Sequence, residues 1–459
     1  MLNFKTKLLA LAAALLCAGP VLAQDSGPLI EILVRKGIIS DTEAEDLRAE
    51  LVKDFVANTP AGKLNLASTV TGFRLAGDVR IRYQYDNEVP NFAAASVGAN
   101  NDRSRYRYRF RFGPTVSFSK NWTAGFRLET ANGATSTNDD FGATGSTNFA
   151  KDANVAYVGQ AFVQYATSNW HFADRVDFRV GKHAHTFFNP GINGFWIDSD
   201  INFEGFSEDF AFTDAFVKGW SLTLRGGQYL LSANSRTAGK VAGDFINQPN
   251  IMWVGQAEYS KTYIYENNPY GTRIAPTLVV FSGPEVTGSA INSDTNNYDS
   301  LATFILPVEH TMKVNNKPLG LYATYGINFK GASRANRLYS TATSYPVVFG
   351  AASGNPPDYD TMYNFGVRYG AVRNPGDWLF TAEYRSVEAG AYTSVLLDSD
   401  FNAGRVNGDG YIVSFSYNWT DAIGTTATYF SSKAIDKTGP AGLGFNKADV
   451  LQLDLTAKF

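Results

Sequence analysis

Thiols and imidazoles are scarce in this chain of 459 residues, which has one cysteine and four histidines. Cys17 lies near the start, so the rest of the chain can form no disulfide and offers no thiolate to a metal. The histidines stand in none of the Ser/His or Asp/His patterns that hydrolases need. His183 and His185 lie two residues apart, but two imidazoles without a third ligand are weak evidence for a metal site. We therefore expect neither an enzyme nor a cofactor.

Long apolar runs are also absent after residue 23, because no stretch reaches the roughly 18 apolar residues of a membrane-spanning helix. The start of the chain is different. Lys5 and Lys7 precede an apolar run, and small residues precede a cut after Ala23, which predicts a signal peptide at residues 1–23. An exported chain of this length without disulfides needs another stabiliser, and the closed hydrogen bonding of a barrel in lipid supplies one.

Alternation is what the sequence has instead. Residues 103–118 read RSRYRYRFRFGPTVSF, in which arginine alternates with an aromatic residue. Because successive side chains of a strand point to opposite faces, the arginines share one face and the aromatics the other. A wall with water on one side and lipid on the other, as in a transmembrane barrel, needs this pattern. An edge strand with a solvated basic face, or a nucleic-acid patch, is the alternative for this segment taken alone.

The end of the chain alternates in the same way. In ADVLQLDLTAKF, apolar positions from Leu451 to Phe459 alternate with polar positions from Gln452 to Lys458. The 42 glycines, the 4 methionines and the 14% of aromatic residues suit a strand-dominated protein with aromatic girdles. Together with the predicted export, these features predict an all-β fold, a transmembrane antiparallel β-barrel, and they argue against a nucleic-acid partner.

Sixteen alternating segments follow residue 73, and short turns and long loops join them in turn. The upward segments are 73–86, 122–132, 176–184, 220–231, 273–282, 319–330, 377–387 and 424–433. The downward segments are 103–118, 154–166, 205–215, 250–260, 299–314, 361–371, 409–419 and 449–459. Long polar loops are expected at 133–151, 283–298, 332–359 and 390–407. Pro276 and Pro307 fall inside expected strands, where a missing N–H is costly, so eighteen strands are the alternative to sixteen.

The segment before the barrel has a helical pattern. Ser40 and Glu43 form a capping box between two short apolar-periodic stretches. These signals predict a periplasmic helical hairpin at residues 24–57, a linker at 58–72 and the barrel at 73–459. Because such short helices are marginal alone, we expect the hairpin to pack against a copy of itself or against a periplasmic or peptidoglycan-associated partner. A tether without any partner is the alternative.

The register of the first strands defines the face that would line a channel. A barrel of sixteen to eighteen strands is too wide for its side chains to fill, so it leaves an aqueous lumen unless a loop folds in. The arginines that we predict to line it are Arg80, Arg82, Arg105, Arg107, Arg109, Arg111 and Arg127. They outnumber the neighbouring Asp78 and Glu129. The alternative is that they pair with lumenal carboxylates from elsewhere and only satisfy a polar interior.

Carboxylate partners are expected in the segment HTFFNPGINGFWIDSDINFE at residues 185–204. The aromatic residues that would anchor it inside the barrel are Phe187, Phe188, Phe195 and Trp196. Its acids, Asp198, Asp200 and Glu204, would then face the arginines across a narrowed eyelet, where fixed charges set ion preference. The alternative is an exposed aromatic loop that touches a surface ligand or a neighbouring subunit.

These features resemble a known family. The sixteen alternating segments, the terminal Phe459 and a third loop placed to constrict are similar to the trimeric general porins of Gram-negative outer membranes. The segments LIEILVRKGIISDTEAEDL, LAGDVRIRYQYD and GKHAHTFFNPGINGFWIDSDINFEG look like the putative porin family, which carries a short helical segment before its barrel. The resemblance implies a non-specific or weakly selective channel for small hydrophilic solutes. It also implies a homotrimer surrounded by outer-membrane lipid and lipopolysaccharide.

The charged residues at the eyelet also predict an ion preference for the expected channel. The excess of arginine over carboxylate at the eyelet predicts that anions are favoured, although the whole chain has a net charge of −3. Remote surface charge is screened by salt, whereas charge in a narrow passage is not. A substrate-selective porin for phosphate or organic anions is the first alternative. A structural outer-membrane anchor and a barrel enzyme are the others.

Overall fold

The computed structural model describes residues 34, 40, 42–46, 66–90, 101–130, 136–142, 156–232, 250–282, 301–340, 359–436 and 445–459. The chain divides into two compact units, Met1–Ala67 and Ser68–Phe459. Within the described ranges, no helix is long and apolar enough to cross a membrane. The predicted signal peptide, and most of the predicted helical hairpin and linker, lie outside the described residues.

A helical turn at residues 42–46 belongs to the first unit. Its start is capped reciprocally. The backbone N–H of Ser40 donates to Glu43 Oε2 at 2.8 Å, and the backbone N–H of Glu43 donates to Ser40 Oγ at 3.3 Å. The predicted capping box is therefore confirmed. The backbone N–H and the hydroxyl of Ser40 both donate to the Glu43 carboxylate, and these two hydrogen bonds lower the pKa of Glu43 below its usual range.

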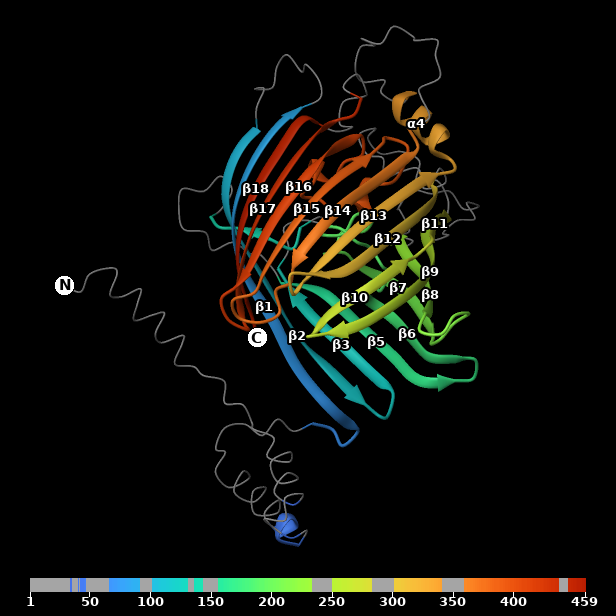
Figure 1. Cartoon of the computed structure of the whole chain (residues 1–459). Helices are drawn as coiled ribbons and strands as arrows, with labels where there is room; N and C mark the ends of the chain where they lie inside the picture. The colour runs from blue at the N-terminus through green and yellow to red at the C-terminus, as the bar shows by residue number, and fades with distance from the viewer. Residues whose placement is uncertain are drawn as a thin grey trace, which may run out of the picture. The chain divides into compact units, whose positions relative to one another are not determined.

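The second unit is a closed antiparallel sheet. Its first nine strands are β1 (Val70–Pro90), β2 (Asn101–Phe118), β3 (Trp122–Glu129), β4 (Asp139–Asp140), β5 (Tyr157–Trp170), β6 (Ala173–Ala184), β7 (Asn202–Phe212), β8 (Ser221–Ser232) and β9 (Asn250–Tyr265). The other nine are β10 (Asn268–Ile274), β11 (Thr277–Ser282), β12 (Ala302–Val314), β13 (Lys317–Asn328), β14 (Thr361–Gly370), β15 (Trp378–Val387), β16 (Gly408–Asn418), β17 (Ile423–Ala434) and β18 (Phe445–Lys458). Strand β1 pairs with both β2 and β18, so the sheet closes into a barrel (Figure 1). Phe459 completes the closure by exchanging backbone hydrogen bonds with Gly77 at 2.9 and 3.0 Å.

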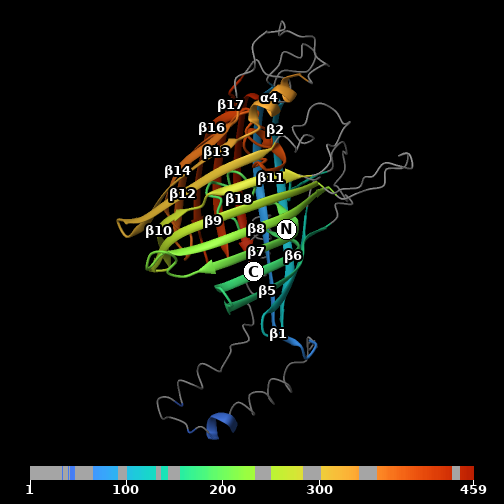
Figure 2. The ribbon, with the colours of Figure 1, turned by 90° about the vertical axis from the view of Figure 1, so that its right-hand side faces the viewer.

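The eighteen strands occupy sixteen positions in the barrel. Strands β3 and β4 pair with successive parts of β2 and form one interrupted strand. Strands β10 and β11 both lie between β9 and β12, so they are also one strand with an interruption. The sixteen predicted segments are therefore confirmed. The strands cross the barrel obliquely (Figure 2), which is the tilt that closure of a sheet requires.

The two prolines inside expected strands explain one interruption. Pro276 separates β10 from β11, where it removes an N–H from the ladder. Pro307 lies inside β12, and its carbonyl accepts the backbone N–H of Ala275 at 3.0 Å. The N–H and C=O of a strand residue point to the same side. An N–H at Pro307 would therefore point toward the interruption between β10 and β11. The two prolines thus face the same gap in the ladder, and Pro307 breaks no further hydrogen bond there.

The connections differ at the two ends of the barrel. At one end, tight turns follow the predicted signals, and Asn315 and Asn316 adopt φ values of 49° and 61° between β12 and β13, as a two-residue hairpin turn requires. Helix α4 (Gly331–Ser340) lies at the other end (Figure 1). It occupies the start of the expected polar loop at 332–359. The expected loops at 133–151 and 283–298 lie largely outside the described residues.

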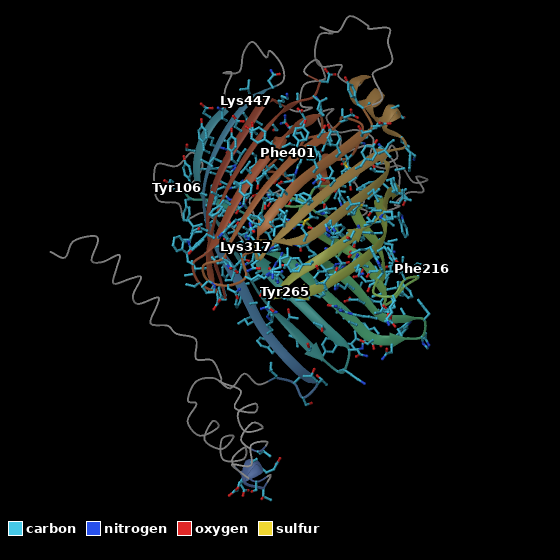
Figure 3. All side chains as sticks on the ribbon, viewed as in Figure 1. Tyr106, Phe216, Tyr265, Lys317, Phe401 and Lys447 are labelled. Atoms are coloured by element: carbon cyan, nitrogen blue, oxygen red, sulfur yellow. The ribbon has the colours of Figure 1, made fainter. Side chains whose placement is uncertain are left out.

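Side chains alternate between an outer and an inner face along β1 and β2. Tyr106 is 63% exposed and projects from the outer surface (Figure 3), whereas Arg107 is 5% exposed. In the pairing of the two strands, Arg82 lies opposite Arg107 and Ile81 lies opposite Tyr108. The arginines of both strands therefore share the inner face.

The loop at residues 185–201, between β6 and β7, folds into the barrel. Its aromatic anchors Phe187, Phe188, Phe195 and Trp196 are buried, as the sequence predicts. The backbone of Phe188 exchanges hydrogen bonds with the Gln256 side chain on β9. The backbone N–H of Ile192 donates to Glu383 on β15 at 2.7 Å. Because β9 and β15 lie in different parts of the ring, the loop reaches both through the interior.

A second loop, at residues 388–407 between β15 and β16, is also buried, and here the sequence prediction was wrong. We expected a long polar loop, but Tyr392 is fully buried, and Leu396 and Phe401 are 2% and 5% exposed. Two short 3₁₀ helices shape the loop, η2 (Ser394–Leu396) and η3 (Asn402–Gly404). Apolar residues spread among its polar ones pack with the first loop in one core against the inner face of strands between β8 and β15.

Candidate functional site

Six of the seven predicted arginines line one cavity of about 750 Å³. They are Arg80 and Arg82 on β1, and Arg105, Arg107, Arg109 and Arg111 on β2. We call these six residues the arginine ladder. Asp198 and Asp200 of the first inward loop line the same cavity, together with Asp400 of the second. Most of the remaining lining also comes from β1, β2, the segment around β4 and the two loops, so the cavity lies against one wall of the barrel.

At one end of the ladder, Arg109 and Arg111 share two carboxylates. Their nitrogens lie 3.0 and 2.7 Å from Asp78 on β1, and 3.5 and 3.7 Å from Asp200 on the loop. The hydroxyl of Thr137 also donates to Asp200 at 3.0 Å. The loop carboxylate is therefore held against the wall by two arginines.

In the middle of the ladder, Arg82 binds Asp454 of β18 through two hydrogen bonds at 2.7 and 2.8 Å. It also reaches Asp400 of the second loop at 3.5 Å. Arg80 donates to the side-chain oxygen of Asn138 at 3.2 Å and lies 3.8 Å from Asp454. The last strand of the chain thus supplies a carboxylate to the first.

At the other end, Arg105 and Arg107 meet Asp140. Because β4 pairs with β2 at Arg107, it brings Asp140 beside the ladder. The Nε of Arg107 donates to Asp140 at 2.8 Å. Arg105 lies 3.6 Å from Asp140 and 3.2 Å from Asp86 of β1.

Every arginine of the ladder therefore has a carboxylate within 3.8 Å. This arrangement agrees with the alternative in which the arginines pair with lumenal carboxylates from elsewhere. The partners that sequence analysis missed are Asp86, Asp140, Asp400 and Asp454. The cavity lining contains seven arginines and six carboxylates, so its charge is nearly balanced.

Two predicted residues do not line this cavity, and one of them, Glu204, requires correction. Arg127 on β3 pairs with Glu129 at 2.8 Å and does not line the cavity. Glu204 lies in β7 on the same outward face as the exposed Phe206, and it pairs with Lys182 at 3.2 Å. Strand β7 begins at Asn202, before the expected end of the loop. The strand alternation therefore turns Glu204 away from the arginines.

Asp198 has a different role from Asp200 within the first loop. Its carboxylate accepts the backbone N–H of Asp200 at 2.9 Å and that of Ser399 at 3.3 Å. Burial raises the pKa of Asp198 from its ordinary value to about 6; the hydrogen bond from the Asp200 backbone opposes this rise, and the charge of the Asp200 carboxylate adds to it. Asp198 is thus a loop carboxylate that gains a proton as the pH falls through about 6.

A second cavity, of about 590 Å³, lies against strands β9 to β14 and also contains paired charges. Arg273 lies 2.9 Å from Glu258, and Arg368 forms an ion pair with Glu309. Sequence analysis named none of these residues. In the part of the chain that the structure describes, no group of three or more His, Cys, Asp or Glu residues could hold a metal ion.

Comparisons with known proteins give a family and a set of similar folds. A family model described as putative porin matches residues 33–241 and 321–459, which is more than half of the chain. A high-pH structure of OprB from Pseudomonas putida has 11% identity and a TM-score of 0.48, and the match covers 84% of this chain and 94% of that one. OmpF from Salmonella typhi in complex with daunomycin has 12% identity and a TM-score of 0.43, with 84% and 97% covered. The outer membrane channel DcaP of Acinetobacter baumannii has 12% identity and a TM-score of 0.42, with 87% and 100% covered.

No curated protein matches the chain in sequence. The family match and the closed antiparallel barrel of sixteen strand positions agree with each other. Porins are barrels of the Gram-negative outer membrane through which solutes diffuse passively, and this is the location and the general activity of the protein. The chain belongs to the putative porin family.

Proposed function

We propose that this porin forms a water-filled channel along the arginine ladder for small hydrophilic solutes. The observation that carries the proposal is the cavity of about 750 Å³, whose lining is almost entirely charged or polar. A solute inside it meets guanidinium groups on the wall and aspartates on the two loops. Opposite charges on the two sides of a passage produce a transverse field, which favours hydrated polar solutes over apolar ones.

The ladder supports a modest preference for anions. Asp78 and Asp454 bind ladder arginines but do not line the cavity, whereas Arg82 and Arg109, which hold them, do. In both pairs the arginine therefore contributes to the lining of the cavity, whereas its carboxylate partner does not. The preference is modest because the lining has seven arginines against six carboxylates.

The close pairing argues against the alternative of a tight site for phosphate or organic anions. A guanidinium that already holds a carboxylate, as Arg82 holds Asp454 with two hydrogen bonds, has fewer donors left for a solute. Weak, repeated contacts along a wall suit conduction better than tight binding, because a solute must also leave.

Three further proposals accompany the channel. Residues 1–23 are removed on export, the protein assembles as a homotrimer, and residues 24–57 contact a periplasmic or peptidoglycan-associated partner. They rest on the sequence signals and on the resemblance to trimeric general porins. The channel itself does not depend on them.

The test is electrical recording of the purified protein in a planar bilayer. We expect stepwise increases in current, and in a salt gradient we expect a reversal potential on the anion side. Folded barrels that insert without producing steps would contradict the channel. Clear steps with a cation-side reversal potential would contradict only the anion preference.

A further inference from the structure

The two inward loops carry the same three residues, Asp-Ser-Asp, at 198–200 and 398–400. The motifs have the same local geometry. The backbone N–H of Asp200 donates to Asp198 Oδ1 at 2.9 Å, and the backbone N–H of Asp400 donates to Asp398 Oδ1 at 3.0 Å. In both loops the first aspartate fixes the turn and leaves the second carboxylate free of the backbone.

The two motifs also hold each other in place. The backbone N–H of Asp198 donates to the Leu396 carbonyl at 2.8 Å, and the backbone N–H of Ser399 donates to Asp198 Oδ2 at 3.3 Å. On the other side, Arg385 of β15 lies 3.1 Å from Asp398, whose side chain is only 2% exposed. The second loop is therefore fixed both to the wall and to the first loop.

Both second aspartates reach the arginine ladder, but at different levels. Asp200 lies beside Arg109 and Arg111, whereas Asp400 lies 3.5 Å from Arg82. Arg82 pairs in register with Arg107, one inward-facing position from Arg109. Inward-facing positions along a strand are separated by about 7 Å. The side chains of Asp200 and Asp400 are 33% and 20% exposed, so both remain accessible from the cavity.

We infer that the β15–β16 loop is a second constricting loop, and that Asp400 is a specificity-determining residue in its own right. The passage then has two carboxylate steps along one arginine wall, Asp200 at the first and Asp400 at the second. Asp398 is a positioning residue, because it is buried on Arg385 and acts through the backbone of Asp400. The inference rests on the proposed channel and adds a second selective position to it.

The experiment compares Asp400→Asn, Asp200→Asn and the double variant with the wild type in planar bilayers under a potassium chloride gradient. The matched control is Asp421→Asn, because Asp421 is exposed in the turn between β16 and β17. Neutral asparagine keeps the size of the side chain and removes its charge. Mobility of unheated samples on gels shows whether each barrel has folded.

We expect each single variant to raise the anion-to-cation permeability ratio by about twofold, because one fixed negative charge leaves the passage. The two aspartates meet different arginines, so the double variant should show about the product of the two effects. The control should leave the ratio unchanged. An unchanged ratio in Asp400→Asn, with a clear change in Asp200→Asn, would overturn the inference and leave the proposed channel intact. A wild-type barrel that never conducts would instead overturn the proposed function, and the inference with it.

A second variant keeps the test decisive if Asp400→Asn does not fold. The chain has no cysteine after Cys17, so Asp400→Cys can be modified selectively with small charged thiol reagents in the open channel. A positively charged reagent should raise the permeability ratio for anions, and a negatively charged one should lower it. If neither reagent changes the ratio, residue 400 does not face the passage and the inference is wrong.

Discussion

The two halves of the barrel interior are built on opposite principles. Against β1, β2 and β18 lie charged groups, and the cavity follows them. On the strands between β8 and β15, the two loops pack on apolar side chains such as Met252, Val279 and Ile305. The paired charges of the second cavity lie on other residues of the same strands. The same loops therefore have an apolar side that fills one half and an acidic side that faces the other.

This difference explains how a wide barrel obtains a narrow passage. A barrel of sixteen strands cannot fill its lumen with wall side chains alone. Here the loops close the apolar half by ordinary core packing and press their aspartates toward the ladder. The passage is therefore displaced to one wall, and its width depends on how firmly the loops are packed on the other.

The largest expected effect on the channel comes from disrupting the packing of the first inward loop on the apolar wall. Trp196 is fully buried in the first loop, and Trp196→Ala should cost about 3–5 kcal/mol of packing. A loop that loses this anchor no longer holds Asp200 at the ladder. We expect single-channel conductance to rise at least about twofold and to become noisier. Trp253→Ala is the matched control, because Trp253 is 45% exposed on the outer face. Equal conductance in both variants would contradict the role of loop packing.

The next largest effect is expected on ion selectivity, from substitutions in the arginine ladder. Replacing Arg107 and Arg109 with glutamine removes two positive charges and leaves Asp140, Asp78 and Asp200 in place. We expect the reversal potential to move toward cations, with the anion-to-cation permeability ratio falling about threefold. Arg127→Gln is the control, because Arg127 does not line the cavity. An unchanged reversal potential in a folded double variant would refute the ladder as the selective wall.

Sequence alone was sufficient for the parts of the molecule that alternate. Period-2 patterning identified sixteen segments because each strand needs a lipid face and a water face. The aromatic side chains of residues 185–201 likewise predicted a loop that packs inside the barrel. The sequence could not show whether Pro276 interrupts one strand or separates two strands, because a proline is compatible with either arrangement.

The carboxylate partners of the arginine ladder could not be predicted from the sequence for a different reason. Asp454 lies on the polar face of the last strand, but its contact with Arg82 depends on the register that closes the barrel. Asp140 depends on a short strand that returns to β2. One available signal was overlooked: the repeated Asp-Ser-Asp motif could have pointed to the second inward loop and Asp400.

A smaller effect should follow pH. Because burial raises the pKa of Asp198 to about 6, its carboxylate is charged at pH about 7.5 and mostly neutral at pH about 5. Acidification therefore removes one negative charge beside Asp200 and Asp400, and we expect the preference for anions to increase as the pH falls through about 6. Asp198→Asn should remove this step while it keeps an oxygen that accepts the backbone N–H of Asp200. The same pH step in that variant would assign the titration to another group.

The smallest effect on selectivity is expected outside the barrel. Tyr106 alternates with Arg105 and Arg107 on β2 but points outward, where its ring lies 5.4 Å from that of Tyr83. Tyr106→Leu keeps an apolar side chain toward the lipid and removes one aromatic pair, which costs about 0.5–1.5 kcal/mol. We expect an unchanged reversal potential and a slightly lower unfolding temperature of the isolated barrel. A change in selectivity comparable to that of the arginine variants would mean that residue 106 faces the passage. The register of β2 would then be wrong by one residue, since a shift of one position exchanges the two faces of a strand.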